Sequence, residues 1–147
     1  MPRNTRKPPA SASLQALLTE ASRRATAELE RVVGREGLPV EFWRVLEVLA
    51  DESGRSMSAL ADAVSMKLPS LSKLIDRMVA QALVQRAPDP HDQRRVLVYI
   101  SDVGLAKVRG LEGPVRRQRT SLESALGRQG GRELRRLLQA LIRERRS

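Results

Sequence analysis

The chain has 147 residues, a formal net charge of +10 and no cysteine. This length supports one domain with its own core, and the absence of cysteine excludes disulfides, thiolate metal ligands and thiol redox chemistry. The basic charge favours a polyanionic partner, whereas a hydrophobic content of 41% exceeds what a disordered basic tail contains. The aromatic residues Phe42, Trp43 and Tyr99 are too few for a platform that stacks single-stranded nucleic acid. A folded protein that binds a duplex is therefore the first hypothesis.

The sequence gives no indication of a membrane-spanning or exported protein. No uninterrupted apolar run is long enough to cross a bilayer, and the basic residues Arg3, Arg6 and Lys7 are not followed by the apolar stretch of a signal peptide. We therefore expect a cytoplasmic protein of bacterial type, associated with the nucleoid and without a membrane partner.

The first part of the chain is predicted to be an arm followed by two helices. Residues 1–12 are basic, rich in proline and without periodicity, so we expect a flexible basic arm. From Leu14 onwards apolar residues recur every three or four positions until Gly34, which predicts the end of the first helix. A second apolar stripe follows Pro39 and ends before the Ser-Gly pair at 53–54, which predicts the second helix.

The middle of the chain is predicted to contain two short helices and a hairpin. Ser56 is expected to cap the third helix, and Pro69 is well placed in the first turn of the fourth. Residues 83–86 are a short strand candidate, and the largely apolar, β-branched residues 95–100 predict a second strand; the turn-forming residues 88–92 predict a charged loop between them. Two strands that follow such helices are typical of a wing.

Two further helices are expected to close the chain. Ser101 or Asp102 is predicted to cap the fifth helix, and Gly113-Pro114 should kink or interrupt it because proline removes a donor and clashes with the preceding turn. The glycine-rich segment 127–131 predicts a turn, and apolar spacing from Leu134 predicts the last helix. The expected fold class is therefore mainly α with a small β-hairpin wing.

The order of elements within residues 57–101 is what a reader of duplex DNA requires. The first helix braces the second, whose polar residues can enter the major groove, and the hairpin loop can place an arginine in the minor groove. Ser70, Lys73 and Arg77 are spaced i, i+3 and i+7 on one side of the predicted fourth helix. For Lys73 and Arg77 the alternative is an ordinary solvated face, and the wing beside them favours DNA contact.

These residues resemble the MarR (multiple-antibiotic-resistance regulator) family of winged helix-turn-helix transcription factors. Segment 68–78 is similar to the recognition helix of the family. The wing signature of the family, an aspartate, any residue and an arginine followed by Leu-Thr-x-x-Gly, corresponds to Asp92 and Arg94 and then to residues 100–104, with Ile-Ser in place of Leu-Thr. A further departure is Ala82, where the family often has a glycine in the turn before the first wing strand.

The resemblance implies a DNA-binding surface on the fourth helix and the wing. Asp92 would orient Arg94 by a charge-assisted hydrogen bond, and Arg94 would reach the minor groove. The residues that correspond to the DNA contacts of the family are Pro69, Ser70, Ser72, Lys73, Arg77, Asp92 and Arg94. Lys67 and Arg95 are further candidates for DNA contact, and for Arg95 the alternative is that it begins the second strand.

The resemblance also implies a homodimer. Residues 13–37 and 102–147 would form a helical dimerisation region around the winged helix-turn-helix DNA-binding domain at 38–101. Two recognition helices would then meet successive major grooves of a palindromic operator, roughly 34–36 Å apart. The implied function is a ligand-responsive transcriptional regulator, a repressor released by a small effector.

The family admits small aromatic acids in a pocket between the dimer helices and the winged domain, and no cofactor is expected. An aromatic pair with basic neighbours would suit an anionic aromatic effector. The candidate effector-binding residues are Arg23, Phe42, Trp43, Arg44 and Leu46. Core packing is the alternative for Phe42, and for Trp43 both interpretations remain open.

Other functions are less well supported by the residues. Asp89, His91 and Asp92 could suggest a metal, but a proline-flanked turn whose carboxylates cap backbone N–H groups accounts for them, so no metal site is expected. The sequence contains no phosphate loop, Ser-His-Asp set or paired-carboxylate signature, so we expect no catalytic residues and no enzyme. Two alternatives stay open: a non-specific architectural DNA-binding protein and a helical protein-interaction module.

The positive charge is concentrated in the last third of the chain. Residues 102–147 carry a net charge of +7, whereas residues 68–101 carry +2. The case for DNA binding therefore depends on the placement of a few side chains rather than on total charge. Direct DNA contact and a solvated outer face are both open for the arginines of the last helix, which are Arg132, Arg135, Arg136, Arg143, Arg145 and Arg146.

Overall fold

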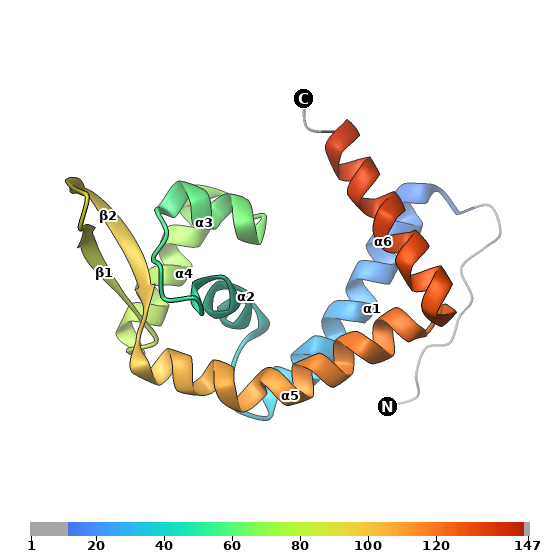
Figure 1. Ribbon diagram of the computed structural model, residues 1–147, viewed down its shortest axis with the longest axis horizontal. Coiled ribbons are helices and arrows are strands. Elements are labelled where there is room, and N and C mark those ends of the chain that lie inside the picture. Colours follow the sequence, from blue (N-terminus) through green and yellow to red (C-terminus); the bar gives the residue numbers. More distant parts are fainter. Residues whose placement is uncertain (1–11, 146–147) are drawn as a thin grey trace.

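The computed structural model describes residues 12–145 and shows a mainly helical chain with one two-stranded antiparallel hairpin (Figure 1). The predicted fold class is confirmed. The expected arm at residues 1–12 lies outside the described residues except for its last residue. The elements are α1 (Leu14–Gly34), α2 (Val40–Leu49), α3 (Met57–Val64), α4 (Leu68–Ala80), β1 (Val84–Asp89), β2 (Asp92–Ile100), α5 (Asp102–Ser124) and α6 (Gly127–Glu144).

Serine caps begin the helices where the sequence predicted them. The Ser56 hydroxyl accepts a hydrogen bond from the Ala59 N–H at 3.1 Å, and the Ser101 hydroxyl accepts one from the Gly104 N–H at 3.0 Å. Each bond satisfies one of the N–H groups that a helix start leaves without a partner. Ser101 also donates to the Ala82 carbonyl at 2.6 Å, which ties the start of α5 to the turn after α4.

The hairpin is longer than predicted. Its strands pair from Val84↔Ile100 as far as Asp89↔Asp92, so the expected loop at 88–92 shrinks to a two-residue turn. Pro88 takes part in this pairing opposite Val96 because each strand of a two-stranded sheet has a free edge, where a missing N–H is tolerated. The register shifts between Pro88 and Asp89, as it does at a β-bulge.

Two predictions for the C-terminal helices are only partly correct. Pro114 does not interrupt α5, which runs through it as one helix and is curved in Figure 1. Val108, Leu111 and Val115 are buried on both sides of the proline, so packing outweighs the lost backbone hydrogen bond. The helix α6 already begins at Gly127, whose φ of +75° serves the turn before the helix, whereas Gly131 lies inside the helix at a close packing contact. A Cβ on Gly131 would lie 2.3 Å from the Glu123 carbonyl oxygen of α5.

The helix α2 lies at the centre of the core. It packs against α1, α3, α4, α5 and β2, and most of its side chains are buried. Within residues 12–145 the buried core contains hydrophobic side chains only. The elements around α2, residues 40–100, form what we call the winged lobe (Figure 1).

The other end of the molecule is built from three helices and has little core of its own. Residues 14–34 and 116–144, here called the helical lobe, comprise α1, the second half of α5 and α6. Both α1 and α6 pack against α5. In the described chain α1 buries only Val33 and α6 buries no residue. None of the described helices is both long enough and apolar enough to span a membrane.

Ala82 occupies a strained position in the turn that follows α4. Its φ angle is +59°, in the left-handed region that L-residues adopt at a cost. The Leu83 N–H donates to the Met78 carbonyl at 3.0 Å, and the Ala82 N–H donates to the Val79 carbonyl at 2.9 Å. This is the pattern of a helix end that usually holds glycine. The turn is therefore preserved although the glycine is absent.

We predict that Ala82→Gly stabilises the protein by about 1 kcal/mol, because glycine adopts a positive φ without steric cost. The matched control is Ala106→Gly on the exposed side of α5, which should lose about 1 kcal/mol as a glycine inside a helix does. Urea unfolding at one fixed protein concentration measures both changes. A loss of stability in both variants would contradict the strain at Ala82.

Candidate functional site

The helix α4 separates a buried apolar face from an exposed polar one. Leu71, Leu74, Ile75 and Met78 are buried against the rest of the winged lobe. The opposite side is exposed and carries every residue predicted for this helix and its start: Lys67, Pro69, Ser70, Ser72, Lys73 and Arg77. The fold thus presents the predicted recognition residues on one solvent-facing surface.

The hairpin is fixed at its base by a third strand segment and beside α4 by an ion pair. The Arg55 N–H donates to the Val98 carbonyl at 3.0 Å, and the Val98 N–H donates to the Arg55 carbonyl at 2.7 Å. On the other strand, the Arg86 guanidinium lies 2.7 Å from the Asp76 carboxylate of α4. An exposed pair of this kind adds roughly 0–1 kcal/mol, so its main effect is to hold the wing and α4 in one relative orientation.

Arg55 is itself held by the loop that follows α2. Its guanidinium lies 2.7 Å from the Asp51 carboxylate. Hydrogen bonds from Arg55 and then from Ser53 lower the pKa of the Asp51 carboxyl from its usual value to about 2. The carboxylate therefore stays charged at neutral pH and keeps Arg55 in place beneath the wing.

The tip of the hairpin exposes Asp92, Arg94 and Arg95 together. Asp92 accepts a hydrogen bond from the backbone N–H of Arg94 at 3.1 Å, and not from its guanidinium as expected. An aspartate two residues before an N–H readily forms this turn, which leaves the Arg94 guanidinium free to extend. Within residues 12–145 no ion pair engages Lys73, Arg94 or Arg95, so their charges are available to phosphates.

An aspartate caps a backbone N–H in the turn at the hairpin tip, as the sequence predicted. The Asp89 carboxylate accepts a hydrogen bond from the His91 N–H at 2.9 Å. In the described part of the chain no three aspartate, glutamate or histidine side chains gather as metal ligands would. The carboxylate of Asp89 therefore acts on the backbone of the turn.

Arg77 and Phe42 form a contact that the sequence did not predict. The guanidinium carbon of Arg77 lies 5.1 Å from the centroid of the Phe42 ring, a distance typical of a cation–π interaction. Phe42 is completely buried. The contact therefore fixes the direction of an α4 side chain relative to α2.

The predicted effector residues are not gathered at one place. Trp43 is 2% exposed and borders a cavity of about 310 Å³ between α2 and α5. Its indole Nε1 is buried and has no hydrogen-bond acceptor among the described residues. The remaining residues that line this cavity are Glu47, Ala50, Val108, Glu112, Val115, Arg116 and Arg119.

The other four candidates lie outside that lining. Phe42 and Leu46 are fully buried in the core. Arg44 donates to the Thr26 hydroxyl at 3.3 Å, which joins α2 to α1. Arg23 pairs with Glu20 on α1 at 2.7 Å. Hydrogen bonds from Arg23 and Arg24 lower the pKa of Glu20 to about 2.

Sequence reasoning missed the arginines that face Trp43. Arg116 and Arg119 come from α5, and Arg119 forms an ion pair with Glu47 of α2. That pair joins positions 72 residues apart, which no local spacing can indicate.

Comparison with known proteins identifies the family. The family model described as MarR family matches residues 36–95, which cover most of the winged lobe. The solved structure of the MarR family transcriptional regulator SPO1453 from Silicibacter pomeroyi DSS-3 is 34% identical with a TM-score of 0.74, and the match covers 89% of this chain and 96% of that one. The chain belongs to the MarR family.

Two relatives within the family are named as repressors. The HTH-type transcriptional repressor IacR of Pseudomonas putida is 34% identical over 89 residues, which are 60% of this chain and 53% of IacR. The homoprotocatechuate degradative operon repressor of Escherichia coli is 25% identical over 130 residues, 88% of each protein. The match thus spans about half the length of IacR and most of the second relative.

Proposed function

We propose that this MarR-family chain is a transcriptional repressor that binds double-stranded DNA through α4 and the hairpin. One observation carries the proposal: the exposed face of α4 and the free arginines of the wing belong to elements that the Asp76–Arg86 ion pair holds together. The names of the two relatives as repressors support the same function.

The two elements contribute different kinds of contact. The polar face of α4 enters the major groove, where Ser70 and Lys73 reach base edges and phosphates. Arg94 lies along the neighbouring minor groove, whose negative potential attracts a guanidinium. Because residues 68–101 carry a net charge of only +2, specificity depends on these few placed side chains.

The protein acts as a homodimer. The helix α6 buries no side chain within the described chain and exposes Leu134, Leu137 and Ile142. Further exposed apolar residues are Leu122 at the end of α5, Leu126 in the turn before α6, and Leu14 and Leu17 on α1. A second copy would cover these surfaces, and its two-fold symmetry would match a palindromic operator.

The cavity beside Trp43 receives a small aromatic acid that releases the DNA. A ring fits against the indole and Val115, while the unpaired indole N–H and the Arg116 guanidinium are donors for a carboxylate. The cavity lies between α2 of the winged lobe and α5, which continues into the helical lobe. A ligand that prefers a different spacing of the two lobes would lower the affinity for DNA by linkage.

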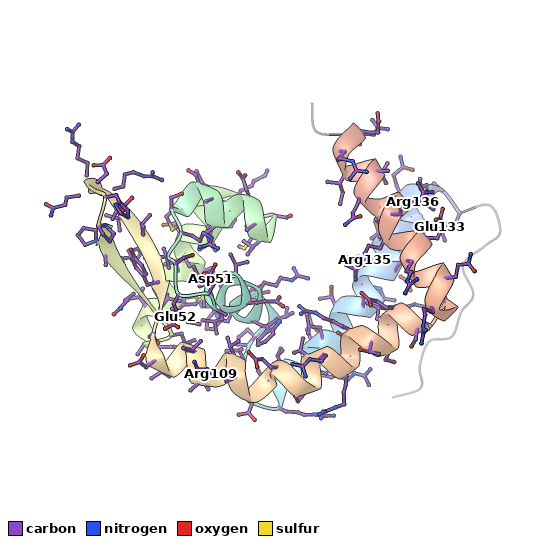
Figure 2. The ribbon with its side chains drawn as sticks, viewed as in Figure 1. Asp51, Glu52, Arg109, Glu133, Arg135 and Arg136 are labelled. Carbon is purple, nitrogen blue, oxygen red and sulfur yellow. The ribbon has the colours of Figure 1, made fainter. Side chains whose placement is uncertain are left out.

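For DNA binding we predict that Arg94→Ala lowers the affinity for the DNA upstream of the gene that encodes this protein. The loss should be about 10-fold to 100-fold, because one minor-groove contact is lost. Fluorescence anisotropy with that duplex and a random duplex, at several salt concentrations, measures the change. The matched control is Arg109→Ala on α5, an exposed arginine far from the hairpin tip (Figure 2), which should bind as the unchanged protein does.

Two outcomes would contradict this assignment. Unchanged affinity in a folded Arg94→Ala protein would remove the wing from the interface. Equal affinity for both duplexes at every salt concentration would identify an architectural DNA-binding protein instead of a specific repressor.

For the dimer we predict that Leu137→Glu lowers the association constant at least about tenfold, because it places an unpaired charge in an apolar interface. The control is Gln139→Glu, which adds the same charge on another side of α6 and should leave the dimer intact. Leu137 and Gln139 are both exposed in the single chain. Sedimentation equilibrium gives the mass of each variant. A dimer of undiminished strength in Leu137→Glu would exclude this face of α6 from the interface.

For the effector we predict that Trp43→Phe and Arg116→Ala each weaken binding of homoprotocatechuate by about tenfold, because each removes a donor to the carboxylate. Calorimetry on DNA-free protein measures this, with the methyl ester of the same acid as the uncharged ligand. Arg117→Ala, an exposed neighbour that does not line the cavity, is the control. Equal binding of acid and ester, or equal binding by all variants, would contradict the site.

A further inference from the structure

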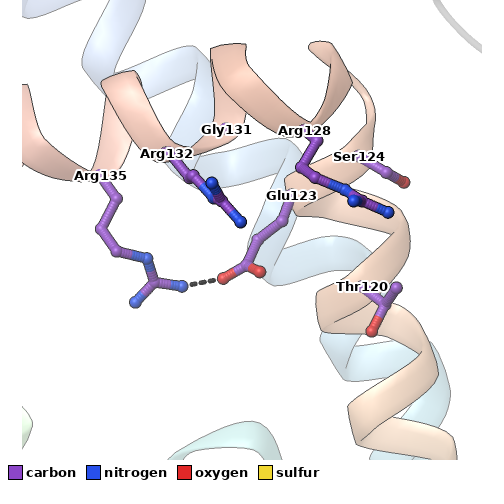
Figure 3. Close-up of a pocket in the computed structure, with 7 residues that line it drawn as sticks. All are labelled: Thr120, Glu123, Ser124, Arg128, Gly131, Arg132 and Arg135. Atoms are coloured by element: carbon purple, nitrogen blue, oxygen red, sulfur yellow. Dashed lines mark ion pairs between the residues drawn. The ribbon is translucent and has the colours of Figure 1, made fainter.

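A second cavity lies where α5 turns into α6, in the helical lobe. It has a volume of about 350 Å³. Figure 1 places this corner at the end of α5 opposite the hairpin, far from the proposed DNA surface. The residues that line it are Thr120, Glu123, Ser124, Arg128, Gly131, Arg132 and Arg135 (Figure 3).

The charges of this cavity are unbalanced. Arg128, Arg132 and Arg135 follow one another at intervals of four and three residues, which places them on one side of α6. Figure 3 shows the side chains of Arg132 and Arg135 extending toward Glu123, and only Arg135 forms an ion pair with it. Among the described residues neither Arg128 nor Arg132 has an acidic partner. Two positive charges are therefore left uncompensated on the same wall.

The close approach of the two helices builds the cavity. Gly131 lies so near α5 that a Cβ would be 2.3 Å from the Glu123 carbonyl oxygen. This contact brings the arginines of α6 opposite Thr120 and Ser124 on α5. The guanidinium groups and the Thr120 hydroxyl offer hydrogen-bond donors from the two helices.

The arginines of the cavity are separate from part of the exposed apolar surface of α6. Leu134 and Leu137 are exposed on a different side of the helix from Arg128 and Arg132, whereas Ile142 lies nearer the arginine side, two turns beyond Arg135. A partner that covers Leu134 and Leu137 therefore need not cover the cavity.

We infer that this cavity binds a phosphate monoester of a small organic molecule. The dianionic phosphate would neutralise the two uncompensated guanidinium groups, whose planar forks suit phosphate oxygens. Its three terminal oxygens would accept from both helices, from the guanidinium groups of α6 and from the Thr120 hydroxyl of α5, whereas the Ser124 hydroxyl already donates to the Ser121 carbonyl. A cavity of about 350 Å³ is within the range of small-molecule sites and leaves room for the organic part beyond the phosphate.

Glu123 sets the strength of this site. Its carboxylate forms an ion pair with Arg135 and repels an incoming anion. It therefore lowers the affinity for the anion that Arg128 and Arg132 attract. Substitutions on the two helices should therefore change affinity in opposite directions, which loss of structure alone would not do.

The test is calorimetry on the DNA-free full chain with glucose 6-phosphate at constant ionic strength, with glucose and inorganic phosphate as comparison ligands. We expect saturable binding of the sugar phosphate, weaker binding of inorganic phosphate and none of glucose. Arg128→Ala and Arg132→Ala should each lose at least about tenfold in affinity, Arg132→Lys should lose less, and Glu123→Gln should bind more tightly. Arg143→Ala on the same helix, outside the cavity, should bind as the unchanged protein does.

The inference fails if the sugar phosphate gives no saturable heat, or if Arg132→Ala and Arg132→Lys both bind it as the unchanged protein does. Inorganic phosphate bound as tightly as the ester would overturn the assignment to a monoester. Since no DNA is present, these results are independent of whether the chain represses transcription.

Discussion

The burial of α2 is the constraint on which the other elements depend. Phe42, Val45, Leu46 and Leu49 are fully buried, and the helix is surrounded by α1, α3, α4, α5 and β2. Side chains packed at crystal-like density cannot shift singly, so a change in the position of this helix must be shared by its neighbours. The recognition helix, the base of the wing and the long helix α5 are therefore positioned by one common element.

Adjacent residues of α2 face the two sites proposed for DNA and for the effector. Phe42 lies beneath Arg77 of the recognition helix, and Trp43 borders the cavity against α5. A ligand beside Trp43 would thus act on the helix that also fixes the direction of Arg77. The Glu47–Arg119 ion pair crosses the same junction, so the spacing of α2 and α5 is the variable that a ligand would change.

Local signals in the sequence predicted most of the fold. Ser56 and Ser101 cap helices as expected because a cap depends on residues three positions away. The errors occur where distant residues decide the outcome. Pro114 stays inside α5 because Val108, Leu111 and Val115 hold that helix in the core, and the glycines near 130 belong to a helix because α6 packs closely on α5.

The candidate sites were predictable to unequal degrees for the same reason. The residues predicted on α4 recur at helical spacing, so the sequence could place them on one exposed face of that helix. Trp43 was recognised, but Arg116 and Arg119 reach it only through tertiary packing, and the sequence could not say that Arg44 points to Thr26 instead. The hydrogen-bond partner of the Asp92 carboxylate could not be predicted either. A short turn offers it both the backbone N–H of Arg94, which it accepts from, and the Arg94 guanidinium.

The distribution of charge separates attraction from recognition. Residues 102–147 carry +7, although within the described chain Arg119, Arg135 and Arg136 are engaged by Glu47, Glu123 and Glu133. A positive field from this region is screened within about 8 Å at physiological ionic strength, so it acts on the rate at which the protein meets DNA and weakens with salt. The contacts proposed for Arg94 and Lys73 would form only after docking and would act on the rate of release. The arginines of residues 102–147 can therefore raise the affinity for every duplex equally. Only the few side chains placed by α2, α4 and the hairpin can make the protein prefer one DNA sequence over another.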